Sequence, residues 1–138
     1  MTTWLIDTAL FKTLAPGPSR GLRAWMEAHD DPIFLSAASL VEIQAAIARL
    51  ARGQAQRADA LRHWLDAMVA GFGDRIHPID AEIASRVGTL LPHSQAGHVR
   101  RRFHDATLVA TAQVHGHGLL TKRDAVFGAW TSIEVASP

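Results

Sequence analysis

Short apolar runs alternate along this chain with longer segments in which apolar residues recur every three or four positions. The runs are typical of buried strands, the third and the last being weaker, and they lie at 4–6, 33–35, 75–79, 119–120 and 132–135. The periodic segments are typical of amphipathic helices and lie at 19–29, 36–51, 55–70, 80–91 and 105–115. This alternation predicts an α/β fold in which a central, mainly parallel sheet of short strands carries helices on both faces.

Individual residues refine this pattern. Ser19 is a favourable N-cap for the helix expected over 19–29. Pro78 cannot donate to a sheet ladder, so the run over 75–79 is expected at a sheet edge or strand end. The helix over 55–70 carries an apolar stripe around Trp64, and it forms a hairpin with the helix that ends near Gly53. Such a stripe packs most often in a core, and the hairpin can also carry a contact with a partner.

Composition narrows the functional classes. With 138 residues, 48% of them hydrophobic, the chain is long enough for one globular domain, expected to span 1–138. It has no cysteine, which excludes disulfides, thiol nucleophiles and cysteine-bound zinc. A net charge of +1 is no footprint of tight, non-specific nucleic-acid binding, so any such contact must be local. No segment reads as a signal peptide or a membrane span, and we expect a cytoplasmic protein without a membrane partner.

Four acidic residues stand where strands end or helices begin: Asp7, Glu42, Asp105 and Asp124. In a parallel sheet, all of them point towards the carboxyl edge, where open α/β sheets bind ligands. Four like charges close together repel one another, and a hard divalent cation such as Mg²⁺ or Mn²⁺ removes that conflict. A metal-activated water next to these carboxylates could attack a phosphodiester, with the metal stabilising the developing charge.

Each acid also has a simpler interpretation. Asp7, Asp105 and Asp124 could each cap the helix or turn that follows. The pair Ser39 and Glu42 has the spacing of a capping box, in which the acid bonds back to the helix start. Spacing alone leaves both interpretations open for every one of the four.

An ordered set of segments resembles the PIN-domain family, specifically the VapC-type toxins of bacterial toxin–antitoxin pairs. The matching segments, in the family's order and at its spacings, are 5–8, 35–43, 104–112 and 118–121. The resemblance implies a PIN-like three-layer α/β/α sandwich and an endoribonuclease that depends on Mg²⁺ or Mn²⁺. It also implies an RNA substrate and a cognate VapB-like antitoxin. The hairpin around Trp64 is the candidate surface for the antitoxin or for a second copy of the chain in a homodimer.

The resemblance assigns roles residue by residue. Asp7, Glu42 and Asp105 match the three principal acids, which would hold the metal. Thr8 matches a hydroxyl that supports the site, and Thr121 matches the Thr or Ser that follows the fourth strand.

Three positions depart from the family's pattern. Ala9 stands where the family often has Asn, Arg123 stands at a usual Asn position, and Val126 stands where an acid is usual. Asp124, one step from the Asn position and followed by Phe127, is taken as the fourth acid and metal ligand. If its side chain points away, the site keeps three acids and one metal.

Basic residues near these acids are candidates for contacts with the RNA backbone, with a solvated surface as the plainer interpretation. They are Arg100, Arg101, Arg102, Lys122 and Arg123. His104, next to Asp105, could contact a phosphate or serve a structural role.

Three rival functions remain at this stage. A PIN-like domain with weakened catalysis could act as a binding module, which Ala9 and the shifted Asp124 keep open. A phosphatase with Asp7 as nucleophile would need a second Asp at the position of Ala9. A DNA nuclease is a further possibility, because metal-assisted cleavage of a phosphodiester does not itself select the sugar.

Overall fold

A computed structural model describes residues 1–93, 99–128 and 133–138 of the chain. Its sheet has five strands in the order β3-β2-β1-β4-β5, and every neighbouring pair is parallel. The strands are β1 (Trp4–Ile6), β2 (Ile33–Ser36), β3 (Ile76–His77), β4 (Gly118–Leu120) and β5 (Val135–Ala136). The predicted α/β fold with a sheet of short parallel strands is confirmed.

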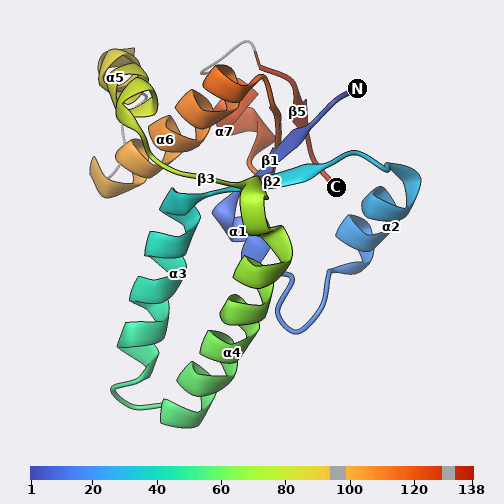
Figure 1. Cartoon of the computed structure of the whole chain (residues 1–138), viewed down its shortest axis with the longest axis vertical. Helices are drawn as coiled ribbons and strands as arrows, with labels where there is room; N and C mark the ends of the chain where they lie inside the picture. Colours follow the sequence, from blue (N-terminus) through green and yellow to red (C-terminus); the bar gives the residue numbers. More distant parts are fainter. Residues whose placement is uncertain (94–98, 129–132) are drawn as a thin grey trace.

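Helices flank the sheet (Figure 1). The α-helices are α1 (Thr8–Lys12), α2 (Arg20–Ala28), α3 (Ala37–Leu50), α4 (Ala55–Phe72), α5 (Ala81–Leu90), α6 (Val99–His115) and α7 (Asp124–Gly128). Two 3₁₀ turns are η1 (Gly73–Arg75) and η2 (Leu91–His93). In Figure 1, α3 and α4 project from the sheet as the predicted hairpin, and α5 lies against α6 on the opposite side.

The central strand β1 is buried on both faces. Trp4 and Ile6 point into a core formed with α1, α2, α3 and α4, whereas Leu5 points into a second core with α6 and α7. Side chains alternate along a strand, so only a continuous apolar run can fill both cores. The prediction of a buried strand at 4–6 is confirmed. Asp7 follows this strand directly and therefore leaves the sheet between its two helical layers.

Close packing between β1 and β4 fixes the edge at which Asp7 lies. Trp4 pairs with Gly118, and a Cβ atom on Gly118 would meet the Trp4 ring at 2.6 Å. The absence of a side chain at Gly118 lets the two strands approach. The backbone N–H of Asp7 donates to the carbonyl of Leu120 at 2.9 Å, so Asp7 and Thr121 leave the sheet side by side.

Several predicted element boundaries are confirmed. Ser19 caps α2 by accepting a hydrogen bond from the N–H of Leu22, and Asp80 caps α5 in the same way from Ile83. The strand before Pro78 lies at the edge of the sheet, as expected for a proline-terminated strand.

Other boundaries differ from the prediction. Helix α6 begins at Val99 rather than at Asp105, because the arginine run is helical, as the high helix propensity of Arg allows. The N-cap of α3 is Ser36, so the capping-box interpretation of Ser39 and Glu42 is wrong. The segment at 94–98, and the start of the last strand expected over 132–135, lie outside the described residues.

A helix that spans a membrane must be both long and apolar. Across residues 1–93, 99–128 and 133–138, none combines the length and the apolar character needed to cross a bilayer.

Candidate functional site

Asp7 is the most buried of the predicted acids, with 1% of its surface exposed. It stands at the N-cap position of α1, but its side chain makes no capping hydrogen bond, so the capping interpretation is wrong. Its Oδ2 accepts a hydrogen bond of 2.8 Å from the hydroxyl of Thr121. Its Oδ1 is buried and has no hydrogen-bond partner among the described residues. Buried polar atoms without a partner are rare, and a carboxylate oxygen in this state fits a cation.

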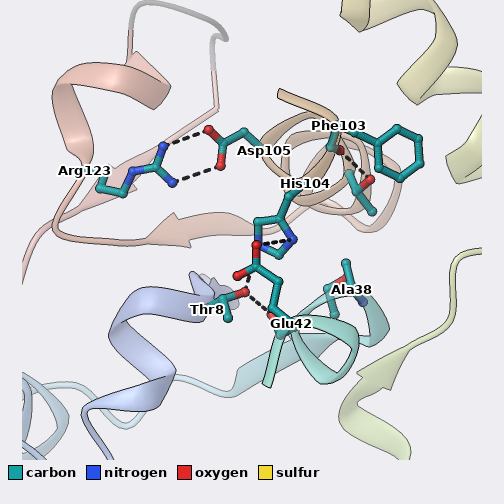
Figure 2. A network of polar contacts seen from close by, with 10 residues as sticks. Thr8, Ala38, Glu42, Phe103, His104, Asp105 and Arg123 are labelled. Carbon is teal, nitrogen blue, oxygen red and sulfur yellow. Dashed lines mark hydrogen bonds and ion pairs between the residues drawn. The ribbon is translucent and has the colours of Figure 1, made fainter. Parts of the chain in front are cut away.

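Glu42 reaches the same region from α3 through a network of polar side chains (Figure 2). The His104 ring, from α6, lies with Nε2 2.9 Å from the Thr8 hydroxyl and Nδ1 3.6 Å from Oε1 of Glu42. The Thr8 hydroxyl also bonds to that of Ser39 at 2.6 Å. The network therefore joins α1, α3 and α6 and holds Glu42 close to the acids of the sheet edge.

His104 responds to all three principal acids. Burial lowers its pKa, while the negative charges of Glu42, Asp105 and Asp7 act in the opposite direction and Arg101 adds to the lowering. The imidazole is therefore mainly neutral near pH 7, with one donor and one acceptor nitrogen. His104 was considered as a phosphate contact or a structural residue, and its buried position between Thr8 and Glu42 is that of a structural residue.

Asp105 forms a bidentate, or two-pronged, ion pair with Arg123 (Figure 2). The two guanidinium nitrogens lie 2.9 and 2.7 Å from the two carboxylate oxygens. The hydrogen bond to Asp105 raises the Arg123 pKa; burial opposes this, and the charges of Asp105, Asp7 and Glu42 add to the rise. The charges of Asp7, Glu42 and Asp105 act on Arg123 and also on His104. These three acids therefore converge on one region of the protein.

The donor atoms suit a hard divalent cation, because Mg²⁺ and Mn²⁺ prefer carboxylate oxygens. Asp7 contributes an unpartnered oxygen, whereas both oxygens of Asp105 face Arg123. Across the three described ranges, no three His, Cys, Asp or Glu side chains stand in position to share one ion. The residues therefore fit a divalent ion in kind, and Asp105 must exchange its partner in order to take part.

The remaining predicted residues lie nearby in different environments. Asp124 is exposed and is the first residue of α7. Its role as a fourth ligand stays a prediction. Asp105 lies inside α6, so the interpretation of Asp105 as a helix cap is wrong. Lys122 is exposed, and Arg123 is engaged by Asp105.

The arginine run divides between two environments. Arg100 and Arg101 line a cavity of about 590 Å³ together with Glu42 and His104. Arg102 does not line this cavity, and its Nε is buried without a hydrogen-bond partner in the part of the chain that the structure describes. A helix turns by about 100° per residue, so three consecutive arginines cannot share one face.

Sequence reasoning missed two basic residues that line the same cavity, Lys12 and Arg49. Both were detectable from helical spacing, because Arg49 follows Glu42 by two helical turns and Lys12 follows Thr8 by one. Ser39 was considered only as a helix cap, although its hydroxyl supports Thr8.

Comparison with known proteins shows to which family the chain is similar. A family model described as PIN domain matches residues 6–129. No curated protein matches the chain in sequence. Among solved structures, FitAcB from Neisseria gonorrhoeae is similar at a TM-score of 0.76 and 22% identity, with 96% of each chain covered.

Two VapBC structures are also similar. VapBC2 from Rickettsia felis, bound to a DNA fragment from its promoter, has a TM-score of 0.70 at 13% identity, with 99% of each chain covered. DNA-bound VapBC from Salmonella typhimurium has a TM-score of 0.69 at 17% identity, covering 99% of this chain and 98% of that one. At these identities the likeness concerns the fold. The family model spans most of the chain, including Asp7, Glu42 and Asp105, and the chain therefore belongs to the PIN-domain family.

Proposed function

We propose that this protein is a Mg²⁺- or Mn²⁺-dependent endoribonuclease and the toxin of a VapBC-type toxin–antitoxin pair. The observation that carries the proposal is the buried, unpartnered Oδ1 of Asp7 at the edge of the sheet where Glu42 and Asp105 converge. A carboxylate in this state is poorly satisfied by the protein alone, and a divalent ion would satisfy it.

Asp7, Glu42 and Asp105 would hold the ion. When bound, it supplies a Lewis acid that stabilises charge on a phosphodiester and lowers the pKa of a coordinated water. The other residues position these acids: Thr121 fixes Oδ2 of Asp7, and His104 with Thr8 limits the movement of Glu42. Asp124 is retained in the proposal as a further ligand from the start of α7.

The cavity beside Glu42 is the proposed path of the RNA backbone. It is lined by Arg100 and Arg101 from α6 and by Lys12 and Arg49 from α1 and α3. Cations along a groove bind the phosphates of a single strand without regard to sequence. Lys122 and Arg123, in the segment after β4, are retained in the proposal as further candidates for contact with the RNA backbone, Arg123 being bonded to Asp105 in the absence of the ion.

The partner proposed for the toxin is a VapB-like antitoxin, with a second copy of the chain forming a homodimer. Similar folds are found in structures whose names include VapBC and FitAcB, and one is described as a toxin–antitoxin complex from Klebsiella pneumoniae. A hollow of about 580 Å³ beside α4, lined by Trp64, Met68 and Phe72, offers an apolar surface for such a contact.

The proposal is tested first by RNA cleavage with and without Mn²⁺. Wild type is expected to cleave only with the metal, and Asp105→Asn is expected to lose about 100-fold in rate, because a metal ligand and the partner of Arg123 are both weakened. The formation of cleaved RNA is followed on denaturing gels, with a chelator as the control for metal dependence. Equal cleavage by wild type and Asp105→Asn would contradict the assignment of Asp105 to the site.

One observation favours a second candidate, a PIN-like binding module with weakened catalysis. Asp105 already has a complete partner in Arg123, so the metal-free arrangement is satisfied at that acid. Calorimetric titration with Mn²⁺ discriminates between the two functions, because a binding module without a metal site takes up no ion.

The basic cavity makes its own prediction. The double variant Arg100→Gln/Arg101→Gln is expected to bind single-stranded RNA more weakly, with a shallower dependence on salt. Each lost phosphate contact reduces the slope of log K against log salt by about 0.7 for single strands. The measurement is fluorescence anisotropy over a series of NaCl concentrations. Arg20→Gln/Arg23→Gln on α2, with the same change in charge, is the matched control, and an equal change in slope for both variants would remove the assignment.

A further inference from the structure

We infer that Arg123 is an internal counter-ion that occupies the metal-binding face of Asp105 until a divalent ion displaces it. Metal uptake and the release of Arg123 are then a single coupled event. The inference rests on the proposed function, because it concerns the same metal site, and it adds a step that controls how the site becomes loaded.

The geometry of the ion pair disfavours binding of both cations to Asp105 at once. Arg123 uses two guanidinium nitrogens, at 2.9 and 2.7 Å, to bond to the two oxygens of Asp105. This two-pronged arrangement directs both carboxylate oxygens at the guanidinium plane. A divalent ion bound at about 2.1 Å from either oxygen would then stand against a positive charge. Arg123 and the metal ion therefore compete for Asp105.

Arg123 is held in place from several directions. Its backbone N–H donates to the Thr121 hydroxyl at 2.9 Å, and that hydroxyl donates to Oδ2 of Asp7. Its guanidinium carbon lies 5.1 Å from the centre of the ring of Phe127, which is fully buried in α7. The segment after β4 thus ties Arg123 to both Asp7 and Asp105, and the guanidinium is a built component of the site.

Charge balance explains why the chain would keep a cation there. Asp105 is only 6% exposed, and Asp7 is more deeply buried still. Without Arg123, the charges of Asp105, Asp7 and Glu42, which all act on its guanidinium, would lose this counter-charge, and that is unfavourable for buried carboxylates. The raised pKa of Arg123 reflects the same interaction from the side of the guanidinium. Arg123 therefore stabilises the metal-free protein and lowers its apparent affinity for the ion.

Release leaves a cation close to the reacting region. A guanidinium set free from Asp105 still begins from a backbone fixed by Thr121. It is then available to bind a phosphate oxygen of the substrate, for which the arginine fork is well suited. The same side chain would thus protect the empty site and grip RNA in the loaded one.

The test is calorimetric titration of the metal-free full chain with Mn²⁺, comparing wild type with Arg123→Gln. A charge-assisted, two-pronged hydrogen bond of this type corresponds to an affinity change of about 10- to 100-fold. We expect Arg123→Gln to bind Mn²⁺ tighter by that factor. We also expect the metal-free variant to melt at a lower temperature than wild type and to gain more from added Mn²⁺.

The matched control is Arg23→Gln, which removes the same charge from an exposed side chain on α2, outside the proposed site. Its Mn²⁺ affinity is expected to equal that of wild type, which separates the specific contact from a general change in charge. A second variant, Arg123→Lys, keeps the charge but loses the fork and is expected to bind with intermediate affinity. It keeps the test decisive if Arg123→Gln does not fold.

The outcomes separate this inference from the proposed function. Equal or weaker Mn²⁺ binding by Arg123→Gln and Arg123→Lys, with normal binding by wild type, would overturn the counter-ion role and leave the nuclease proposal standing. No uptake by wild type or by either variant would overturn both.

Discussion

Asp7→Asn is expected to reduce Mn²⁺-dependent RNA cleavage by about 1,000-fold while leaving the fold intact, a loss comparable to that of removing a principal charge-stabilising group. Asp7 is the deepest of the converging acids, and its Oδ1 is the buried carboxylate oxygen that has no partner within the described residues. Asn keeps the shape and the oxygen that accepts from Thr121, but it removes the negative charge that a divalent ion requires.

Stability provides the second readout for this variant. Burial of a charge is unfavourable and Asp7 is 1% exposed, so its replacement by a neutral side chain is expected to leave the melting temperature unchanged or to raise it by a few degrees. Asp66→Asn, at an exposed site on α4, is the control and is expected to change neither cleavage nor stability. Undiminished cleavage by Asp7→Asn would remove the metal-site assignment, whereas loss of cleavage together with unfolding would point to a structural role for the acid.

The placement of Asp7 was predictable because it depends on local sequence and general topology. An apolar run that ends on an acid identifies a buried strand with a polar residue at its carboxyl end, and parallel strands bring such ends together. Thr121 follows β4 by the same logic, and its hydroxyl donates to Asp7, whereas its role in supporting the site stays a prediction.

The partner of Asp105 was not predictable in this way. Arg123 was expected to contact RNA, and nothing in its spacing from Asp105 indicates a two-pronged ion pair between α6 and the segment after β4. The contact depends on side-chain rotamers and on the packing of the guanidinium over the Phe127 ring, and sequence periodicity encodes neither. The start of α6 was missed for a related reason, since a charged run carries no apolar stripe to mark a helix.

A cluster of three histidines was also invisible in the sequence, because its members come from β3, the end of α6 and the residue before β4. Nε2 of His77 lies 2.7 Å from Nε2 of His117, and the rings of His77 and His115 stack with centroids 3.7 Å apart. Nδ1 of His117 lies 2.6 Å from the Thr3 hydroxyl. Phe34 stacks on both His77 and His117, so the cluster is packed against the core of the sheet.

Protonation of this cluster is expected to destabilise the protein in mild acid. Burial, with the neighbouring His77 and His115, lowers the pKa of His117 from 6.5 to about 4, and the pKa of His77 is lowered as well, by burial and by His115 against an opposing effect of Asp80. Between these values the unfolded chain binds more protons than the folded one, so the free energy of unfolding rises with pH. The stabilisation is complete above about pH 6.5 and is lost as the pH falls towards 4.

At about 1.4 kcal/mol per pKa unit, His117 alone corresponds to a loss of up to about 3 kcal/mol over this range. Urea denaturation at a series of pH values from about 7 to about 4.5 measures it, and in His117→Gln the dependence on pH is expected to be shallower. Carboxylates also titrate in the lower part of this range, so the difference in slope between wild type and variant is the relevant quantity. His63→Gln, at an exposed position on α4, should keep the wild-type slope. If His117→Gln keeps it too, the clustered rings do not govern stability in acid, because a neutral side chain at position 117 has no proton to take up.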